Sequence, residues 1–393
     1  MRIGIVWPDT VRLAGLSIRF DRYREGFRQL GHEAIVISTA EAAEGCEWAD
    51  VSVPTPAALH DPALYAGLRL DAALVLTWLG MPDIMAAARP HVRHLISLTD
   101  SDGVIGVRVF PARVLNRMVL VQSNFGDRLR TAGWWLRQYV GIHRGVDREL
   151  VESGRLADRI IVFSPGAKEN LGAFFAHHGE DALVNRIVVA PFPVGSAFEH
   201  DPVSVDREDR VIAIGRWDDP QKGTGLLVGA LERYLRDGGR WKFTLIGRCG
   251  EKPFRSLLAT FPDRVEYRSA VAQDEVAGLL GRARVLLSTS RWESGPIVAS
   301  EALLRGCSLV GPASIPSFAQ FCDAGCGRTF GRRSVSAVVA ALGAEAEAWD
   351  TGRRDPFAIA ARWYGYFTPE GVCRRVLDGL ESPAVTRIAT ASE

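Results

Sequence analysis

Two glutamates flank a predicted helix start in the second half of the chain. Glu293 and Glu301 are separated by seven residues, and the intervening Gly295-Pro296 pair is typical of a helix beginning. Glu293 would then precede the first turn and Glu301 would lie one to two turns inside. Free amides at a helix start can bind an anion or a sugar hydroxyl, and ionised carboxylates accept hydrogen bonds from hydroxyls. The pattern suits ribose and hexose binding. Taken singly, Glu293 could only stabilise the helix N-terminus, and Glu301 could lie on an exposed helix face.

A second loop places two cations after a predicted strand at residues 211–214. Gly215 and Arg216 follow this strand directly, and Lys222 follows six residues after Arg216. Glycine at a strand end lets a ligand approach, and an arginine fork with a lysine point charge could clamp a diphosphate. The chain contains only four lysines, which favours a role for Lys222. On spacing alone, both cations could also be solvated surface charges.

Two candidates lie in the first half. Gly15 stands in a small-residue turn before a predicted helix, where free amides could face a phosphate, or where glycine only makes the turn. Asp100 and Asp102 flank Ser101 after an apolar run. The two aspartates could hold Mg²⁺ or Mn²⁺ against a diphosphate, or form an Asx-rich turn.

Short β-branched runs alternate with longer helical patterns twice along the chain, which indicates two α/β units with mainly parallel sheets. An irregular segment rich in Pro, Asp and Ser separates them, so we place the domain boundary near residue 205. Ligands bind at the carboxyl ends of strands in such folds, which predicts a site in the cleft between two sheets. The predicted strands span residues 2–6, 34–38, 73–77, 94–98, 160–163, 187–190, 211–214, 242–246, 265–267, 285–288 and 308–310.

Composition narrows the class of partner. Lys plus Arg total 47 against 46 Asp plus Glu, so the net charge of +1 gives no general attraction to nucleic acid. The first residues lack a secretory signal, no apolar run is long enough to span a bilayer, and the scattered cysteines show no zinc or disulfide pattern. We therefore expect a cytoplasmic protein with no nucleic-acid partner.

One segment departs from this charge balance. Residues 105–145 hold seven arginines against one acid, Asp127, with aromatic residues interleaved. Such a segment could lie peripherally on an anionic membrane, at its inner face, or bind an anionic acceptor. We favour the alternative that its apolar residues belong to the core of the first domain and its arginines to the solvated face.

The ordered set of segments resembles the retaining glycosyltransferases of family four, which have the GT-B fold. The first 150 residues, which carry the acceptor site in that family, match only in outline. Residues 160 to about 330 carry the matching pieces in the family's order, namely IIVFSPGAKENL, VVAPFPVGSAF, AIGRWDDPQKG, FTLIGRCGE, VEYRSAVAQDEVAGLLGRARVLLSTS and the two-glutamate helix start with EALLRGCSLVG.

Carried over by position, the resemblance implies specific roles. Arg216 and Lys222 would hold the diphosphate of a nucleotide-sugar, Glu301 the ribose, and Glu293 a sugar hydroxyl. Asp100 would position the acceptor. The other implied donor-binding positions are Gly15, Gly215, Gly247, Val271, Gly295, Pro296 and Ile297.

The sequence departs from the family pattern in three places. Pro296 lacks an amide that the usual residue would donate, and Pro193-Val194 replaces the usual Asn-Gly of the linker motif. The histidine that many members carry after the fourth strand is replaced around Thr99-Asp100. The missing histidine is tolerable, because in this family the departing phosphate is thought to help deprotonate the acceptor.

The combined expectation is an enzyme of two tandem Rossmann-like domains, residues 1–205 and 206–355, with a C-terminal helix and tail over 356–393 that can pack back on the first domain. It would move a sugar, with retention, from a nucleotide-sugar to an unidentified acceptor, using no metal and no cofactor. The alternatives are a GT-B epimerase or phosphorylase, a metal-dependent GT-A transferase using Asp100 and Asp102, and a non-catalytic sugar-binding protein.

Overall fold

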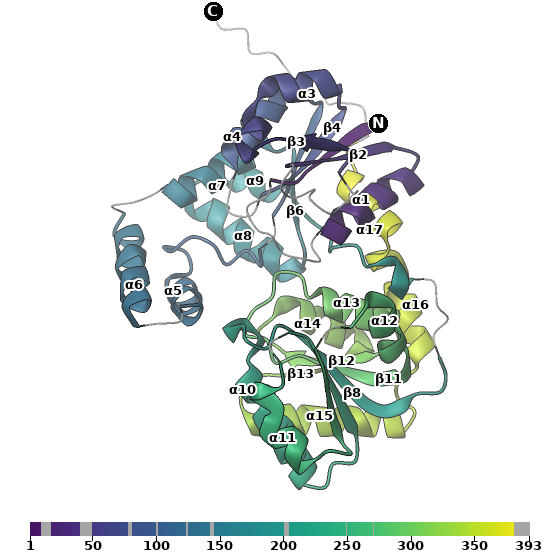
Figure 1. Cartoon of the computed structure of the whole chain (residues 1–393). Helices are drawn as coiled ribbons and strands as arrows, with labels where there is room; N and C mark the ends of the chain where they lie inside the picture. The colour runs from purple at the N-terminus through teal and green to yellow at the C-terminus, as the bar shows by residue number, and fades with distance from the viewer. Residues whose placement is uncertain are drawn as a thin grey trace, which may run out of the picture.

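The chain folds into two α/β domains, each built on a parallel sheet (Figure 1). The computed structural model describes residues 1–8, 17–39, 49–77, 81–99, 101–122, 125–141, 145–199, 204–248, 250–269 and 271–380.

Within these residues, seven strands form the N-terminal sheet in the order β3-β2-β1-β4-β5-β6-β7. Its strands are short apolar runs buried on both faces, as is typical of parallel sheets covered by helices. They are β1 Arg2–Val6, β2 Glu33–Thr39, β3 Val51–Val53, β4 Ala72–Leu76, β5 His94–Leu98, β6 Arg159–Val162 and β7 Ile187–Val189.

The C-terminal sheet has six strands in the described part of the chain, in the order β10-β9-β8-β11-β12-β13. Every pairing in both sheets is parallel. The strands are β8 Glu208–Ile214, β9 Lys242–Ile246, β10 Val265–Arg268, β11 Ala283–Leu287, β12 Ser308–Pro312 and β13 Gly327–Phe330.

All eleven predicted strands are present, with ends shifted by up to three residues. The sequence prediction missed β3 and β13, which lie at the two sheet edges. Their sequences, VSV and GRTF, are short and interrupted by polar residues or glycine, so neither carries the apolar run by which a strand is recognised.

Helices cover both faces of the N-terminal sheet. Successive residues of β1 point to opposite faces. Ile5 packs into a core shared with helix residue Phe20, and Val6 packs into a second core shared with Met85 and Phe174. The helices of this half are α1 Ser17–Gln29, α3 Pro62–Leu68, α4 Pro82–Ala88, α5 Pro111–Leu120, α6 Phe125–Tyr139, α7 Gly145–Leu156, α8 Pro165–His177 and α9 Asp181–Val184.

One continuous core holds the C-terminal domain together. Its helices and those that follow are α10 Thr224–Arg236, α11 Arg255–Thr260, α12 Gln273–Arg282, α13 Ile297–Leu304, α14 Pro316–Phe321, α15 Val335–Asp350, α16 Pro356–Phe367 and α17 Pro369–Leu377.

The last helix returns to the N-terminal domain. α17 lies against α1 and buries Val372 and Val376 in the core that contains Ile5 (Figure 1). The two helices approach closely because a side chain at Gly26 would overlap the backbone carbonyl of Pro369. The chain therefore crosses between the domains twice, once after β7 and once at α16–α17.

The first crossing is fixed by a buried arginine. Arg22 of α1 donates from Nε to the carbonyl of Val194 at 2.7 Å and pairs with the equally buried Glu199. Burial lowers the pKa of Arg22, while the neighbouring Glu25 raises it. A charge taken out of water in this way needs its partners, so the ion pair ties the connecting segment to the N-terminal domain.

The prediction for residues 105–145 is partly wrong. Ile105 and Val107 are buried as core residues, but α5 and α6 stand away from both sheets (Figure 1). On α6, Phe125 is 74% exposed and Leu129 is 58% exposed. These apolar side chains do not belong to the core, because the N-terminal sheet is already covered by α4, α7 and α8.

Within the described residues, no helix is both long and apolar enough to cross a bilayer. The two tandem parallel-sheet domains also exclude the GT-A fold that the sequence left open as an alternative.

Candidate active site

A cavity of about 620 Å³ lies between the two domains, within the usual size of a small-molecule site. It opens at the carboxyl ends of β8, β9 and β11, where parallel sheets bind their ligands. The residues that line it are Ser101, Asp102, Arg117, Ile214, Gly215, Arg216, Gln221, Lys222, Gly247, Arg248, Leu286, Leu287, Ser288, Ser290, Trp292, Glu293, Ser294, Gly295, Pro296, Ile297, Val298, Ala299 and Phe318.

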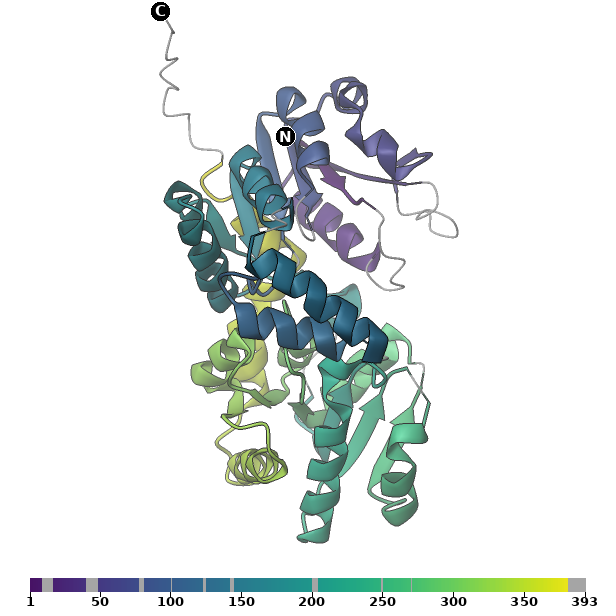
Figure 2. The same ribbon diagram turned by 90° about the vertical axis from the view of Figure 1, so that its left-hand side faces the viewer.

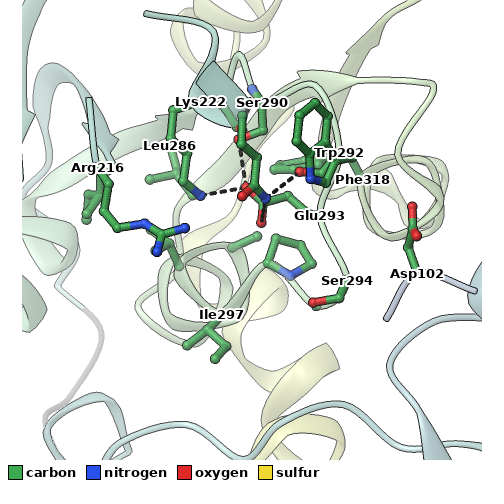
Figure 3. A pocket seen from close by; sticks show the side chains of 18 of the residues that line it. Asp102, Arg216, Lys222, Leu286, Ser290, Trp292, Glu293, Ser294, Ile297 and Phe318 are labelled. Carbon is green, nitrogen blue, oxygen red and sulfur yellow. Dashed lines mark hydrogen bonds and ion pairs between the residues drawn. The ribbon is translucent and has the colours of Figure 1, made fainter. Parts of the chain in front are cut away.

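The carboxylate of Glu293 lies at the centre of a polar cluster in this cavity (Figure 3). Its Oε1 accepts from Lys222 Nζ at 2.7 Å and from Ser290 Oγ at 2.7 Å, and its Oε2 accepts from Gln221 Nε2 at 3.2 Å. The side chains of Lys222 and Glu293 are 17% and 13% exposed. The sequence prediction gave these two residues separate ligands, whereas the structure joins them directly.

The loops that carry this pair are tied to each other. Gln221 donates to the carbonyl of Trp292 at 2.7 Å, and Thr289 Oγ1 donates to the carbonyl of Lys222 at 2.9 Å. Arg333 donates to the backbone carbonyls of Ser290 and Thr289, at 2.5 and 2.8 Å. Burial, together with the nearby Arg291, lowers the pKa of Arg333. The two loops therefore form one rigid unit.

Two glycines allow this arrangement. Gly223 has a φ of +65°, which is a left-handed conformation, and it ends the short helix Pro220–Lys222 just before α10. Gly247, at the end of β9, has a φ of +139°, and a side chain there would overlap the carbonyl of Gly215. The strand ends of β8 and β9 can therefore approach each other only with glycine at Gly247.

Arg216 lies on the opposite side of the cavity from Asp102, with its guanidinium directed toward the centre (Figure 3). It is about half exposed and pairs with Asp219 Oδ2 at 2.8 Å. Asp219 also caps the short helix by accepting from the amide of Gln221 at 2.9 Å. One carboxylate therefore holds Arg216 and the loop that presents Lys222.

Helix α13 begins at the cavity wall. Pro296 is its N-cap residue, and no side chain caps the helix start. The first amides of a helix have no partner within the helix, and the helix dipole favours an anion at this end. Gly295 lies against Phe163 of the N-terminal domain, where a Cβ would come within 2.9 Å of the Phe163 Cβ.

Three described residues of the N-terminal domain line the cavity. Asp102 accepts a bidentate ion pair from Arg117, at 2.8 and 2.6 Å. The same guanidinium stands over the ring of Trp292 at 5.6 Å, so Arg117 bridges the two domains beside Ser101. Among the described residues, no group of three or more His, Cys, Asp or Glu side chains is arranged to hold a metal ion.

The predicted residues fall into three groups. Glu301 lies one turn into α13 and Val271 packs against the C-terminal core, and both are outside the cavity lining. Gly15 and Asp100 lie outside the described residues. One cavity brings together Gly215, Arg216, Lys222, Gly247, Glu293, Gly295, Pro296 and Ile297.

Sequence reasoning missed several contributors. Gln221 and Ser290 donate hydrogen bonds to Glu293, and Arg333 holds the backbone of the loop that carries Ser290. Arg117 and Trp292 contact each other across the two domains. Gln221 and Ser290 lie within segments that the sequence analysis quotes, so those segments could have pointed to them. Arg333 and Arg117 lie 40 or more residues from the loops that they contact, and no local pattern marks them.

Comparison with known proteins agrees with this geometry. The sequence profile of the family described as Glycosyl transferases group 1 matches residues 208–344. No curated protein matches the chain.

Solved structures match it over its whole length. A glycosyltransferase from Rickettsia africae ESF-5 is 13% identical with a TM-score of 0.66, covering 97% of this chain and 99% of that one. Anabaena Alr3699/HepE, solved in complex with UDP, is 15% identical with a TM-score of 0.62, covering 98% and 100%. A structure from Listeria monocytogenes assigned as a UDP-N-acetylglucosamine 2-epimerase is 13% identical with a TM-score of 0.57, covering 97% and 96%.

The fold is therefore GT-B, with two parallel-sheet α/β domains facing one cavity. Residues 208–344, which supply most of the cavity lining, match the profile of the glycosyl transferases group 1 family. The chain is a glycosyltransferase.

Proposed function

We propose that this enzyme is a retaining glycosyltransferase of family four that moves a hexose or related sugar from a nucleotide-sugar to an acceptor hydroxyl. The observation that carries the proposal is the Lys222–Glu293 pair at the start of α13, with Arg216 across the cavity. Cations and a helix start suit a diphosphate, and a carboxylate beside them suits a sugar hydroxyl. A group 1 glycosyltransferase profile over the same residues supports the assignment.

In this proposal Lys222 and Arg216 bind the diphosphate, and the first amides of α13 add hydrogen bonds. The Lys222–Glu293 ion pair keeps both side chains in place before the donor arrives, which reduces the ordering cost of binding. On binding, Lys222 shares its charge with the phosphate, and Glu293 accepts a hydroxyl of the transferred sugar. Glu301 would bind the ribose, and Val271 and Gly247 would contact the base. Gly15 would approach the diphosphate from the N-terminal domain.

The proposed reaction exchanges one bond for another on the same face of the sugar. The bond from the anomeric carbon to the phosphate oxygen breaks, and the acceptor oxygen forms a new bond to that carbon. The acceptor proton passes to the departing phosphate oxygen. The protein's part is to orient both substrates and to stabilise charge on the departing diphosphate. Asp100 would position the acceptor.

We infer that the diphosphate charge is met by Arg216, Lys222 and the helix start, without a metal or another cofactor. Asp102, the possible metal ligand of the GT-A alternative, is held by both nitrogens of Arg117 instead. This engagement supports the metal-independent proposal.

The test begins with nucleotide binding. Because Anabaena Alr3699/HepE was solved with UDP, UDP is the first candidate, with GDP, ADP and dTDP as comparisons. A nucleotide that binds only the native state increases the free energy of unfolding by mass action, by about 2.7 kcal/mol at a hundredfold excess over Kd. The melting temperature rises accordingly. No shift with any of the four nucleotides would contradict donor binding, and hence the proposal.

Product analysis then separates the alternatives. A transferase forms a glycoside and releases nucleotide only when an acceptor is present, with the anomeric configuration of the donor kept. The Listeria neighbour makes an epimerase the second candidate, and it would convert the donor sugar without any acceptor. Release of a sugar 1-phosphate from a glycan by inorganic phosphate would indicate a phosphorylase. Nucleotide-sugar binding without turnover would indicate the sugar-binding alternative.

We infer a cytoplasmic location for this reaction. Four cysteines in the described part of the chain are free and buried, which fits a reducing compartment. Burial raises the pKa of Cys307 to about 11, so this thiol stays protonated at neutral pH. Contact with a membrane, where it occurs, is peripheral and involves residues 105–145.

A further inference from the structure

The helix α6 carries an exposed apolar stripe that no other part of the described chain covers. Phe125, Leu129 and Leu136 of the helix, and Val140 directly after its end, are spaced by four, seven and four residues, which places them on one side. All four are more than half exposed, at 74%, 58%, 53% and 55%. A monomeric protein exposes single apolar residues commonly, but an aligned row of them marks an interaction surface.

The opposite side of α6 is held against α5. Trp135 Nε1 donates to the carbonyl of Pro111 at 3.1 Å, and the Trp135 ring stacks on Tyr139 at 5.2 Å. Arg108 donates to the carbonyl of Tyr139 at 3.2 Å. These contacts fix which face of the helix turns outward. The stripe is therefore presented by the hairpin that α5 and α6 form.

Cationic side chains border the stripe. Arg128, Arg130 and Arg137 are exposed, and the one acid among the described residues of α6, Asp127, is already paired with Arg130. An apolar stripe between arginines is the pattern of helices that lie in the plane of an anionic lipid surface. Each arginine near such a surface adds attraction to its negative potential.

A second copy of the chain fits this surface less well. A twofold contact through the stripe would bring the same arginines of both copies together. Like charges at close range oppose association, whereas lipid phosphates neutralise them. The charges therefore favour lipid over a second copy.

We propose that α6 is a docking surface for an anionic membrane, with the stripe of Phe125, Leu129, Leu136 and Val140 buried at the level of the lipid headgroups. The hairpin of α5 and α6 lies at the height where the two domains meet (Figure 2). α5, its other helix, carries Arg117, which lines the cavity. Docking would therefore bring the acceptor side of the cavity near the membrane. The proposal is independent of the reaction that the cavity performs.

The test is flotation of the full chain with vesicles of phosphatidylcholine alone or with 30 mol% phosphatidylglycerol. The wild type is expected to float with the anionic vesicles and to be released by high salt. Leu129→Ser/Leu136→Ser should lower the bound fraction about tenfold, since it removes buried apolar area. Arg128→Gln/Arg137→Gln should lower binding only to the anionic vesicles.

Matched controls come from exposed residues elsewhere. Phe357→Ser, on α16, removes an apolar side chain that is 47% exposed and should leave flotation unchanged. Arg233→Gln, on α10, removes an exposed arginine and should also have no effect. Circular dichroism and the nucleotide-induced melting shift report whether each variant is folded, without use of lipid.

Three outcomes would overturn the proposal. The wild type could fail to float with either vesicle, or the serine double variant could float as well as the wild type. A wild type that is dimeric by light scattering, and becomes monomeric in the serine double variant, would assign the stripe to a second copy instead.

Discussion

The two sides of the cavity are built differently. On the C-terminal side, Glu293 accepts from three side chains, and the loops around it are joined by further hydrogen bonds. On the N-terminal side, the described lining consists of Ser101, Asp102 and Arg117, and the last of these lies on α5, which pairs with the exposed helix α6. The first side is a rigid set of charges, and the second depends on one ion pair.

This difference has a physical reason. In the proposed reaction every donor carries a nucleotide diphosphate, which needs fixed charges in a fixed geometry. The N-terminal side, where the proposal places the acceptor, instead combines one inter-domain contact, Arg117 over Trp292, with the exposed hairpin of α5 and α6. Changes on the two sides should therefore affect different steps of the reaction.

The largest effect is expected from Glu293→Gln. Glutamine keeps the size of the side chain but removes the charge, so its hydrogen bond to the sugar weakens. Lys222, freed from a competing carboxylate, offers its full charge to the phosphate, which offsets the ordering lost with the ion pair. We expect kcat to fall about a hundredfold, the order seen when one polar contact to a transition state is lost. The Kd for free nucleotide, measured by calorimetry, should not rise.

Glu232→Gln, an exposed change on α10, is the control and should leave kcat unchanged. Weaker binding of free nucleotide by Glu293→Gln would instead indicate that Glu293 contacts the nucleotide and not the sugar. Glu301→Gln should show the reverse pattern, because the proposal places Glu301 at the ribose. Equal effects of both changes on free nucleotide would contradict the division between them.

Lys222→Ala tests the donor side next. A lost charge-assisted hydrogen bond costs about 1–3 kcal/mol, so the nucleotide Kd should rise about fivefold to 150-fold. The protein should stay folded without nucleotide, because Glu293 keeps its hydrogen bonds from Ser290 and Gln221. Lys252→Ala removes an exposed lysine as the control. An unchanged Kd for Lys222→Ala would remove this residue from the site.

A smaller effect is expected on the acceptor side from Arg117→Ala. The change frees Asp102 and removes the contact with Trp292, so the acceptor KM should rise about tenfold, or ~1.4 kcal/mol. The nucleotide Kd should stay constant. Arg117→Lys keeps the charge but not the bidentate geometry and should be intermediate. Arg113→Ala, which removes an exposed arginine on the same helix, is the control. A nucleotide Kd that rises with Arg117→Ala would contradict the separation of nucleotide binding from the N-terminal side of the cavity.

The smallest effect is expected from chelation. With the diphosphate charge met by Arg216, Lys222 and the start of α13, EDTA should leave most of the activity intact. The measurement is initial rate with and without EDTA, followed by addition of Mn²⁺. Activity lost to EDTA and restored by Mn²⁺ would show that a metal takes part and that the donor side is not sufficient by itself.

The alternation of strands and helices, and with it two parallel-sheet α/β domains, could be predicted from the sequence because each buried parallel strand is a short apolar run. The GT-B arrangement of these domains came from the family resemblance. The helix start at Gly295-Pro296 could also be predicted, since Pro and Gly act through the local backbone. The edge strands β3 and β13 could not, because they are short and interrupted by polar residues or glycine.

Residue types and spacing by themselves determined two α/β domains, a cationic loop at Arg216 and Lys222, and a carboxylate at a helix start. Only the tertiary structure decided that Lys222 pairs with Glu293, that Arg333 holds their loop from below, and that Arg117 reaches the second domain. It also decided that α6 faces outward, where the sequence favoured a core position. A periodic pattern shows that a helix has an apolar side, but what that side contacts depends on packing between residues far apart in the chain.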